Sequence, residues 1–401
     1  MNMPFQPPRA ATKKAGNAGK RPPFDCIALL LQGGGALGAY QAGVYEGLAE
    51  ANLHPDWVAG ISIGAINAAL IAGNAPNVRV DRLRAFWDRI SADPLDWSFD
   101  LPVRFGGDLA RRLANQWHAS AAMLWGAPGL FSPRMSAPFL AAAGTQAATS
   151  FYDTSVQRST LERLIDFDRI NSGEMRFSVG AVNVTTGNFV YFDNSTHEIR
   201  PEHIMASGAL PPGFPAIEID GEYYWDGGLV SNTPLQWVLE NSERQDTLAF
   251  QVDLWSAQGA VPRTLGEVIM RQKEIQYSSR TRASSDQFKK EQRLRNALAD
   301  LISKLPDKLR ETPEFALLNP EAGRKVYNII QLIYRSKQHE GESKDFEFSS
   351  QSMADHWSAG LNDTVRTLRH PEVLERPTSA DGVSTCSNSL AAANTSVICW
   401  K

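Results

Sequence analysis

The chain has 401 residues, which is enough for a large hydrophobic core and an appended segment. Its 40 basic and 44 acidic residues nearly balance, which gives no general case for nucleic-acid binding, and no apolar run approaches the roughly 20 residues of a membrane-spanning helix. The three cysteines (Cys26, Cys386 and Cys399) form no cluster with metal-ligand spacing, so we predict no metal site and a reducing compartment rather than a disulfide scaffold.

The first 24 residues carry basic side chains, such as Lys13 and Lys14, and no acidic one. They lack the apolar stretch of a secretory signal, so they predict a disordered basic tail on a cytoplasmic protein. Attraction of this tail to an anionic membrane surface is the alternative interpretation.

A glycine loop follows the first predicted strand. Residues 26–31 are apolar, residues 33–38 read G-G-G-A-L-G, and residues 39–48 have helical apolar spacing. Backbone N–H groups that converge at a helix N-terminus form an anion cradle. The loop satisfies a dinucleotide fingerprint, with Glu50 or Asp56 near the ribose-binding position, and it equally suits an oxyanion hole.

Residues 60–64 read G-I-S-I-G and lie between an apolar approach and a run of small helical residues. A serine on a sharp strand-to-helix turn, flanked by glycines, exposes a nucleophilic hydroxyl. An acyl-transfer site needs both a nucleophile and oxyanion donors, whereas a dinucleotide site needs no such serine. The pair of motifs therefore favours Ser62 as a nucleophile beside an oxyanion hole.

Residues 76–175 have an irregular pattern and hold four of the tryptophans. Residues 101–138 mix apolar side chains with proline and glycine and carry little charge, which is typical of an acyl pocket or lid and equally of ordinary core packing. Residues 175–184 and 189–192 then predict two strands around a Thr-Gly-Asn turn.

Another strand-like run ends in Asp226, Gly227 and Gly228, and residues 232–234 (N-T-P) open a predicted helix. Upstream, residues 206–215 predict a helix end and a loop rich in proline and glycine. A serine nucleophile needs a base within hydrogen-bond reach, which could be a histidine or an aspartate such as Asp226.

These four blocks, at residues 32–38, 60–64, 206–215 and 226–228, resemble the patatin-like phospholipases in order and spacing over residues 25–255. The resemblance implies a three-layer α/β/α fold with a mainly parallel sheet and hydrolysis of an acyl ester through an acyl-enzyme, without a cofactor. It implies Ser62 as the nucleophile and Asp226 as its base, with no catalytic histidine. The remaining residues that it implies are the oxyanion hole at Gly33, Gly34, Gly35 and Ile63, and the motif glycines Gly38, Gly60, Gly64, Gly227 and Gly228.

The sequence departs from the family pattern at two positions of the glycine loop. Gln32 stands where the family often has aspartate, and Leu37 stands where it often has arginine or lysine. Loss of the basic residue leaves the backbone donors in place but weakens the case for an anionic phospholipid.

A histidine triad is the rival mechanism. In α/β-hydrolases the chain order is serine, acid, histidine, and only His339, His356 and His370 follow Asp226. These three lie in a polar C-terminal region, and His197 and His203 precede Asp226 and are interpreted as surface or helix-start residues.

Residues 248–254 predict another strand, and residues 265–305 predict a long helical stretch. Basic residues outnumber acidic ones over residues 263–310, so this stretch could contact a membrane periphery or be a solvated face. Residues 326–334 suit a helix or a strand, and residues 350–369 predict a helix. The whole segment resembles a C-terminal module found in some bacterial patatin-like proteins.

The predicted organisation is a tail (1–24), an acyl hydrolase domain (25–258), a mostly helical C-terminal module (259–375) and a disordered Ser/Thr/Ala/Asn-rich tail (376–401). The predicted function is a serine-dependent lipid acyl hydrolase of phospholipase A, lysophospholipase or carboxylesterase type. The alternatives are an esterase on hydroxyalkanoate oligomers or other neutral esters, and a catalytically silent lipid-binding or scaffold protein.

Overall fold

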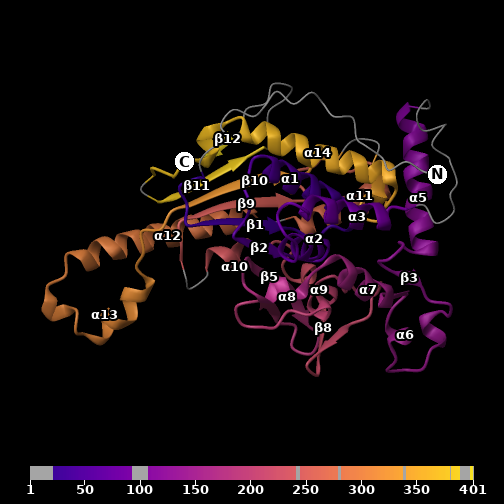
Figure 1. Cartoon of the computed structure of the whole chain (residues 1–401), viewed down its shortest axis with the longest axis horizontal. Coiled ribbons are helices and arrows are strands. Elements are labelled where there is room, and N and C mark those ends of the chain that lie inside the picture. The colour runs from indigo at the N-terminus through magenta and orange to yellow at the C-terminus, as the bar shows by residue number, and fades with distance from the viewer. Residues whose placement is uncertain are drawn as a thin grey trace.

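The computed structural model describes residues 21–92, 107–240, 244–278, 281–336, 340–379, 381–388 and 398–400. Its centre is a ten-stranded sheet in the order β12-β11-β10-β9-β1-β2-β5-β8-β7, with β6 paired beside β5. Helices lie on both faces of this sheet (Figure 1). Most of the predicted basic tail falls outside the described residues.

Pairing is parallel from β11 through β10, β9, β1 and β2 to β5, and antiparallel toward both edges. A separate two-stranded sheet pairs β3 with β4. The strands are β1 (Cys26–Leu31), β2 (Trp57–Gly60), β3 (Ser132–Pro133), β4 (Tyr152–Asp153), β5 (Arg176–Asn183), β6 (Phe189–Asp193), β7 (Ile217–Ile219), β8 (Glu222–Asp226), β9 (Thr247–Asp253), β10 (Tyr327–Ile333), β11 (Val383–Ser387) and β12 (Ile398–Trp400).

The α-helices are α1 (Ala39–Glu50), α2 (Ile63–Ala72), α3 (Arg79–Ile90), α5 (Gly107–Trp125), α6 (Gln146–Thr149), α7 (Ser155–Leu164), α8 (Phe167–Asn171), α9 (Pro201–Ser207), α10 (Leu235–Leu239), α11 (Leu265–Tyr277), α12 (Thr281–Ser303), α13 (Pro313–Leu318) and α14 (Ser350–Leu368). Short 3-10 helices include η1 (Gly35–Gly38), η3 (Gly227–Leu229) and η6 (Gly341–Ser343). The described part of the predicted irregular region contains α3, α5, α6, α7 and α8.

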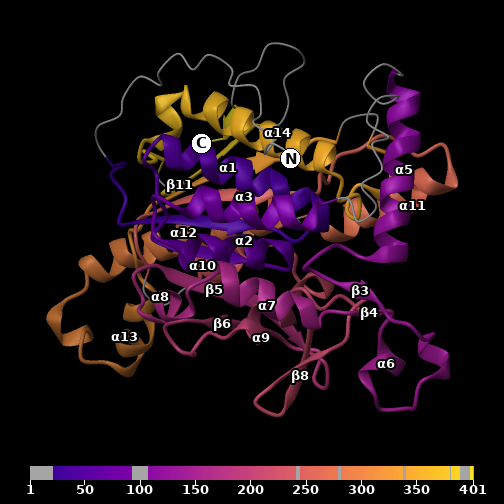
Figure 2. The same cartoon turned by 45° about the vertical axis from the view of Figure 1, so that its right-hand side comes forward.

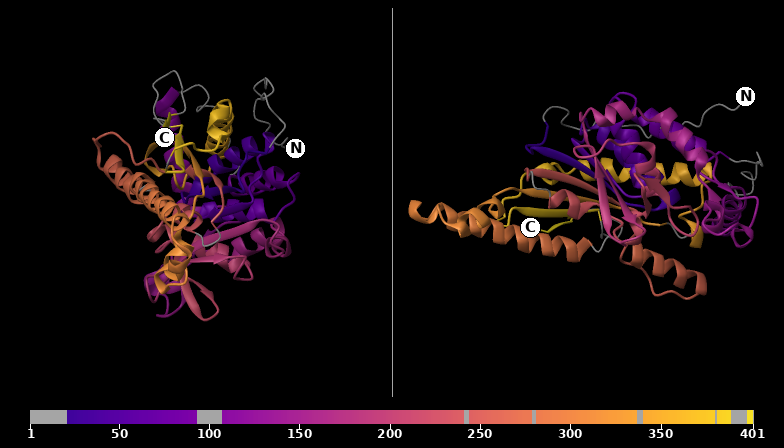
Figure 3. Two further views of the ribbon diagram at one scale, coloured as in Figure 1. Left: turned by 90° about the vertical axis from the view of Figure 1, so that its left-hand side faces the viewer. Right: turned by 90° about the horizontal axis from the view of Figure 1, so that it is seen from below.

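Alternate side chains of the central strands face two different cores. Ile27, Leu29 and Leu31 of β1 pack with α1, α2, α3 and α14, whereas Ala28 and Leu30 pack with α10 and α12. Figure 2 shows α14, α1 and α3 one above another, and the left view of Figure 3 places α12 and α14 on opposite sides of the sheet. β1 is apolar throughout because both of its faces are buried. The predicted three-layer α/β/α fold is confirmed.

The C-terminal segment is mostly helical, as predicted, but it also completes the central sheet. β10 pairs in parallel with β9, and β11 extends the sheet beyond it. α14 lies against α1 with backbone contact, since an added Cβ at Gly43 would be 1.9 Å from the Trp357 carbonyl oxygen and one at Gly360 would be 2.0 Å from the Tyr40 carbonyl oxygen. Strands and helices from both sides of the predicted boundary at residue 258 therefore share the same layers.

The prediction of a disordered tail over residues 376–401 is wrong for β11 and β12. β11 is buried, and its backbone pairs with β10 on one side and β12 on the other. The many Ser, Thr and Ala residues suggested a polar coil, but pairing on both sides satisfies the backbone of a strand regardless of composition. Cys386 on β11 is disulfide-bonded, contrary to the expectation drawn from the cysteine count, whereas Cys26 is a buried free thiol.

The predicted long helix of residues 265–305 is two helices. α11 ends at Tyr277, because Ser278 has extended backbone angles (φ −58°, ψ 139°). Among the helices in the described ranges, none combines the length and the apolar character that a bilayer span requires. Several basic side chains proposed for membrane contact have acidic partners within the chain, in the pairs Arg271–Glu274, Lys273–Asp345 and Arg293–Asp381, at 2.8–3.0 Å.

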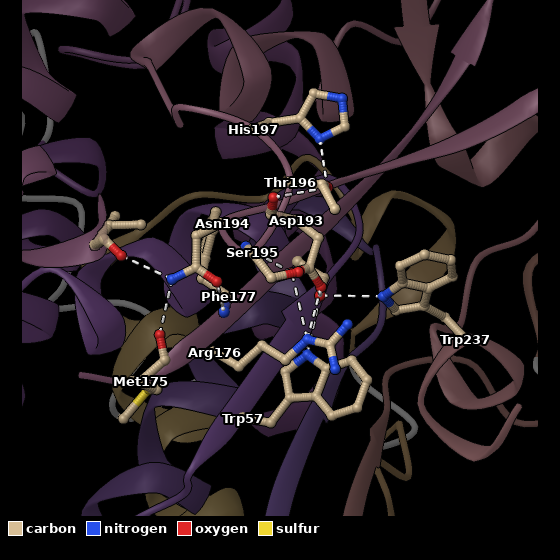
Figure 4. A network of polar contacts seen from close by, with 12 residues as sticks. Trp57, Met175, Arg176, Phe177, Asp193, Asn194, Ser195, Thr196, His197 and Trp237 are labelled. Carbon is tan, nitrogen blue, oxygen red and sulfur yellow. Dashed lines mark hydrogen bonds and ion pairs between the residues drawn. The ribbon is translucent and has the colours of Figure 1, made fainter. Parts of the chain in front are cut away.

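A buried polar network joins β2, β5 and β6 to α10 (Figure 4). The Ser178 hydroxyl accepts hydrogen bonds from the indole N–H groups of Trp57 (2.9 Å) and Trp237 (3.1 Å) and donates to the Asp193 carboxylate (2.6 Å). Arg176 pairs with the same carboxylate at 3.0 Å. Burial acts to raise the pKa of Asp193, but hydrogen bonds from Ser178 and Ser195 and the charge of Arg176 outweigh it, so the pKa lies below its usual range.

Ser178→Ala is expected to lower the free energy of unfolding by about 3 kcal/mol, because it leaves the buried indole of Trp57, the half-buried indole of Trp237 and a buried carboxylate short of a partner. Urea denaturation followed by tryptophan fluorescence measures this loss. Ser159→Ala is the matched control, since Ser159 is exposed and its hydroxyl, among the described residues, bonds only to the Val156 carbonyl, and it should change stability by less than about 0.5 kcal/mol. Equal midpoints for the two variants would contradict the structural role of this network.

Candidate active site

Ser62 lies on the turn between β2 and α2, at φ 55° and ψ −123°. A non-glycine residue at positive φ is strained, and such strain is held only where the surroundings fix it. The Ser62 N–H donates to the Ser207 hydroxyl (3.0 Å), which in turn donates to the Gly180 carbonyl (2.7 Å). The turn therefore has the geometry that the G-x-S-x-G pattern predicts for a nucleophile elbow.

The glycines of this pattern are required by close backbone approach. An added Cβ at Gly60 would lie 2.3 Å from the Gly64 carbonyl oxygen, and one at Gly64 would lie 2.3 Å from the Leu31 carbonyl oxygen. Since backbone atoms cannot move aside cheaply, neither position accepts a side chain. The end of β1 and the start of α2 are thereby held together.

Asp226 is the last residue of β8, opposite Ala181 of β5, and is fully buried. The Gly228 N–H donates a hydrogen bond to its carboxylate at 2.7 Å. Burial raises the pKa of Asp226 to about 6, although the Ser62 hydroxyl and the Gly228 N–H act to lower it. The structure thus brings the two predicted residues, 164 positions apart in the chain, to the wall of one cavity.

The glycine loop passes beside Ser62. The Gly33 N–H donates to the Asn232 carbonyl at 3.4 Å, whereas the N–H groups of Gly34, Gly35 and Ile63 have no acceptor within the part of the chain that the structure describes. All three residues line the same cavity as Ser62. The loop and the start of α2 therefore offer unused donors beside the serine.

Three more of the predicted motif glycines stabilise the region around Ser62 and Asp226, two by close contacts and one by a hydrogen bond. An added Cβ at Gly38 would be 2.6 Å from Ile63 Cγ1, and one at Gly227 would be 2.7 Å from the Gly180 carbonyl oxygen. Gly228 supplies the N–H that binds Asp226.

Gln32, one of the two departures from the family pattern, is a buried residue that braces the glycine loop. Its side-chain oxygen accepts from the N–H groups of Leu254 (2.6 Å) and Trp255 (3.0 Å). Its amide nitrogen donates to the Thr233 hydroxyl (2.9 Å) and to the Tyr277 carbonyl (3.0 Å). An amide can both accept and donate here, which a carboxylate could not. The other departure, Leu37, is fully buried in the core.

Asn232 is a second brace, and the sequence predicted it only as a helix opener. Its side-chain nitrogen donates to the carbonyl groups of Gly33 (3.0 Å) and Tyr277 (2.9 Å). Gln32 and Asn232 together tie the loop to the C-terminal end of α11. No local pattern distinguishes these two polar residues from ordinary turn residues.

A cavity of about 360 Å³ opens at Ser62. Residues of the predicted pocket or lid segment contribute to its wall, as do Tyr152, Leu210 and Phe214, and most of its lining is apolar. Acidic Asp226 and Asp345 line it, and within the described residues no lysine or arginine does. The contributions of the predicted segment are Ala122, Met123, Leu130 and Phe131, and those that the sequence missed are Trp255, Tyr277, Asp345, Phe346 and Phe348.

Within the described residues, no histidine lines the cavity, and His339 lies outside them. The His203 ring accepts from the Arg200 N–H (2.9 Å) at the start of α9, and burial lowers its pKa to about 4. His356 lies behind the glycine loop, with its Nδ1 at 3.3 Å from the Ala36 carbonyl oxygen. The described residues of the chain contain no group of three or more His, Cys, Asp or Glu side chains arranged to hold a metal ion.

The chain is similar to known proteins in family and in fold. Residues 29–238 match the model of a family described as patatin-like phospholipase, and residues 275–380 match one described as patatin phospholipase. No curated protein matches the chain. Among solved structures, VipD from Legionella pneumophila aligns with 14% identity and a TM-score of 0.39, over 85% of this chain and 66% of that one, just under two thirds of its length. The first family match spans more than half of the chain and contains both Ser62 and Asp226.

Proposed function

Because the chain belongs to the patatin-like phospholipase family, we propose that it hydrolyses the acyl ester bond of a lipid through Ser62 and Asp226. The observation that carries this proposal is that a serine on a strained turn and a buried carboxylate lie together at the wall of an apolar cavity. A nucleophile whose hydroxyl donates to a base is the arrangement that covalent acyl transfer needs.

In the proposed reaction, Ser62 Oγ attacks the ester carbonyl carbon while its proton passes to Asp226. The negative charge on the former carbonyl oxygen is stabilised by the N–H groups of Gly34, Gly35 and Ile63, which have no other acceptor in the described structure. Gly33 contributes to the loop but its N–H already binds Asn232.

Collapse of this intermediate breaks the ester bond, and the leaving alkoxide takes the proton from Asp226. Water then attacks the acyl-enzyme with Asp226 again as the base, which releases the fatty acid and restores Ser62. A carboxylate is ordinarily a weak base, but burial brings the pKa of Asp226 to about 6, closer to neutrality, where general bases work best.

The lining of the cavity also bears on the substrate. An apolar wall suits an acyl chain, whereas its two acidic side chains oppose an anionic headgroup inside it. We therefore place the acyl chain in the cavity and the headgroup outside, and we retain neutral esters, including hydroxyalkanoate oligomers, as the second candidate substrate class. Hydrolysis of phosphatidylcholine, phosphatidylglycerol and a 3-hydroxybutyrate oligomer, compared at equal concentration, distinguishes the two classes.

Covalent labelling with a fluorophosphonate tests the proposal directly. The folded protein is expected to gain one phosphonyl group, read by intact mass, and peptide mapping should place it on Ser62. Protein unfolded in urea is the control and should gain none, because only the assembled site activates the hydroxyl. Absence of an adduct on the folded protein, with lipid present and without it, would favour the silent lipid-binding alternative.

A further inference from the structure

The glycine loop rests on a backbone carbonyl from the C-terminal segment. The Ala36 N–H donates to the Asp345 carbonyl oxygen at 2.9 Å. The same oxygen is so close to Gly35, which has φ 57°, that an added Cβ there would lie 2.1 Å from it. Since Gly34 and Gly35 immediately precede this contact, the position of the Asp345 carbonyl sets where their unused N–H groups point.

Lys344 and Asp345 are held by two adjacent and oppositely charged residues of α11, one each. Lys273 Nζ lies 2.9 Å from the Asp345 carboxylate, and Lys344 Nζ lies 2.8 Å from the Glu274 carboxylate. Lys344 is almost fully buried and also donates to the Ser336 hydroxyl at 2.6 Å. These two crossed ion pairs fix where Lys344 and Asp345 lie along α11 and which of its residues each one faces.

Two aromatic residues, Phe346 and Tyr277, lie close to the Lys273–Asp345 ion pair and also help to support the glycine loop. Lys273 Nζ lies 4.2 Å from the ring centre of Phe346, which lines the cavity. One turn further along α11, the Tyr277 carbonyl oxygen accepts hydrogen bonds from the side-chain amides of Gln32 and Asn232. The end of α11 therefore supports the glycine loop from two sides, through Tyr277 directly and through Lys273 and Asp345.

We propose that Lys273 is a positioning residue of the acyl hydrolase site, which acts by anchoring Asp345 so that its carbonyl holds the oxyanion donors of the glycine loop in place. This inference rests on the proposed function. Lys273 does not line the cavity and touches no reacting atom, so its effect passes through the loop. A misplacement of about 1 Å at reacting groups can lower a rate ~10²-fold, so a loosened loop should reduce turnover without a comparable loss of substrate binding.

The kinetic test compares Lys273→Met with Lys273→Arg. The methionine variant is expected to lose about tenfold in kcat on a nitrophenyl ester with KM changed less than about twofold, and arginine should recover most of the loss. A trifluoromethyl ketone, whose adduct with Ser62 carries the oxyanion, should bind the methionine variant about tenfold more weakly, whereas binding of the product fatty acid should not change. Arg293→Met, which breaks the exposed Arg293–Asp381 pair, is the matched control and should alter none of these quantities.

Hydrogen exchange supplies a readout that does not depend on activity. Peptides covering residues 33–37 should exchange faster in Lys273→Met than in the wild type and in Arg293→Met, because the Ala36 N–H loses its fixed acceptor. Asp345→Asn, which keeps the size of the side chain, should have the same effect even if the methionine variant folds poorly. Faster exchange in Lys273→Met than in the wild type, together with a wild-type protein that has no esterase activity, would uphold the anchor and reject the proposed function. Unchanged exchange in the folded variants, or a fall in kcat without faster exchange, would overturn the proposal.

Discussion

Ser62→Ala is expected to lower kcat on a short-chain nitrophenyl ester at least ~10³-fold, because the covalent route requires the hydroxyl. The folded state should persist, since the Ser62 N–H, and not its side chain, binds Ser207. Steady-state kinetics on the purified variant, with circular dichroism to confirm folding, measures both. Activity within tenfold of the wild type would contradict the assignment of Ser62.

Ser62→Gly is the matched control for this substitution. Glycine adopts the φ of 55° without strain, whereas alanine does not. The free energy of unfolding of the glycine variant, measured by denaturant titration, should therefore exceed that of the alanine variant by about 1 kcal/mol. The two variants should be equally inactive. A difference in stability with equal loss of activity separates the chemical role of the hydroxyl from the strain of the turn.

Asp226→Asn is expected to reduce kcat at least ~10²-fold, because the amide accepts a hydrogen bond from Ser62 but cannot take its proton. In the wild type, kcat/KM should fall as pH falls through about 6, since the carboxylate with this raised pKa must be ionised to act as a base. The residual activity of the asparagine variant should lack this dependence. A pH–rate profile of both proteins from pH 4.5 to 9 provides the comparison.

The free energy of unfolding should depend on the ionisation of Asp226 in the opposite direction to kcat/KM. The pKa of Asp226 is higher in the folded protein than its ordinary value of 3.8, so the folded state binds the proton more tightly. Its contribution to stability is present below pH 3.8 and is lost as pH rises through about 6. Asp226→Asn should therefore be more stable than the wild type at pH 8. Full activity in this variant would require another base and would contradict the Ser–Asp assignment.

The fold could be predicted, and the two central residues of the candidate site could be proposed, because their signals are local. Six apolar residues before the glycine loop indicate β1. Ser62 follows β2, Asp226 ends β8, and glycines come shortly after both residues. Parallel strands direct such ends to one edge of a sheet, so a correct order of elements already places the loop and the serine together. The family resemblance added the pairing of Ser62 with Asp226, which residue patterns alone left open between aspartate and histidine.

The wall of the cavity could not be predicted in the same way. Tyr277 ends α11 and Asp345 follows η6, and neither position carries a motif or a periodic pattern that points toward Ser62. Asp345 acts on the loop through its carbonyl, a group that every residue has, so no sequence signal can mark it. β11 was missed for a related reason, because its pairing with β10 and β12 is decided by distant strands and not by its own composition.

The support of the glycine loop by Asp345 also orders events during synthesis on the ribosome. Ala36 and its neighbour His356 are 320 residues apart in the sequence, and β1 pairs on one side with β2, the next strand in the chain, but on its other side with the distant β9. Pairings of such high sequence separation form late, because a long loop must close before any contact stabilises it. The serine turn therefore leaves the ribosome long before the segment that the glycine loop rests on, and the loop gains this support only after Asp345 has been synthesised.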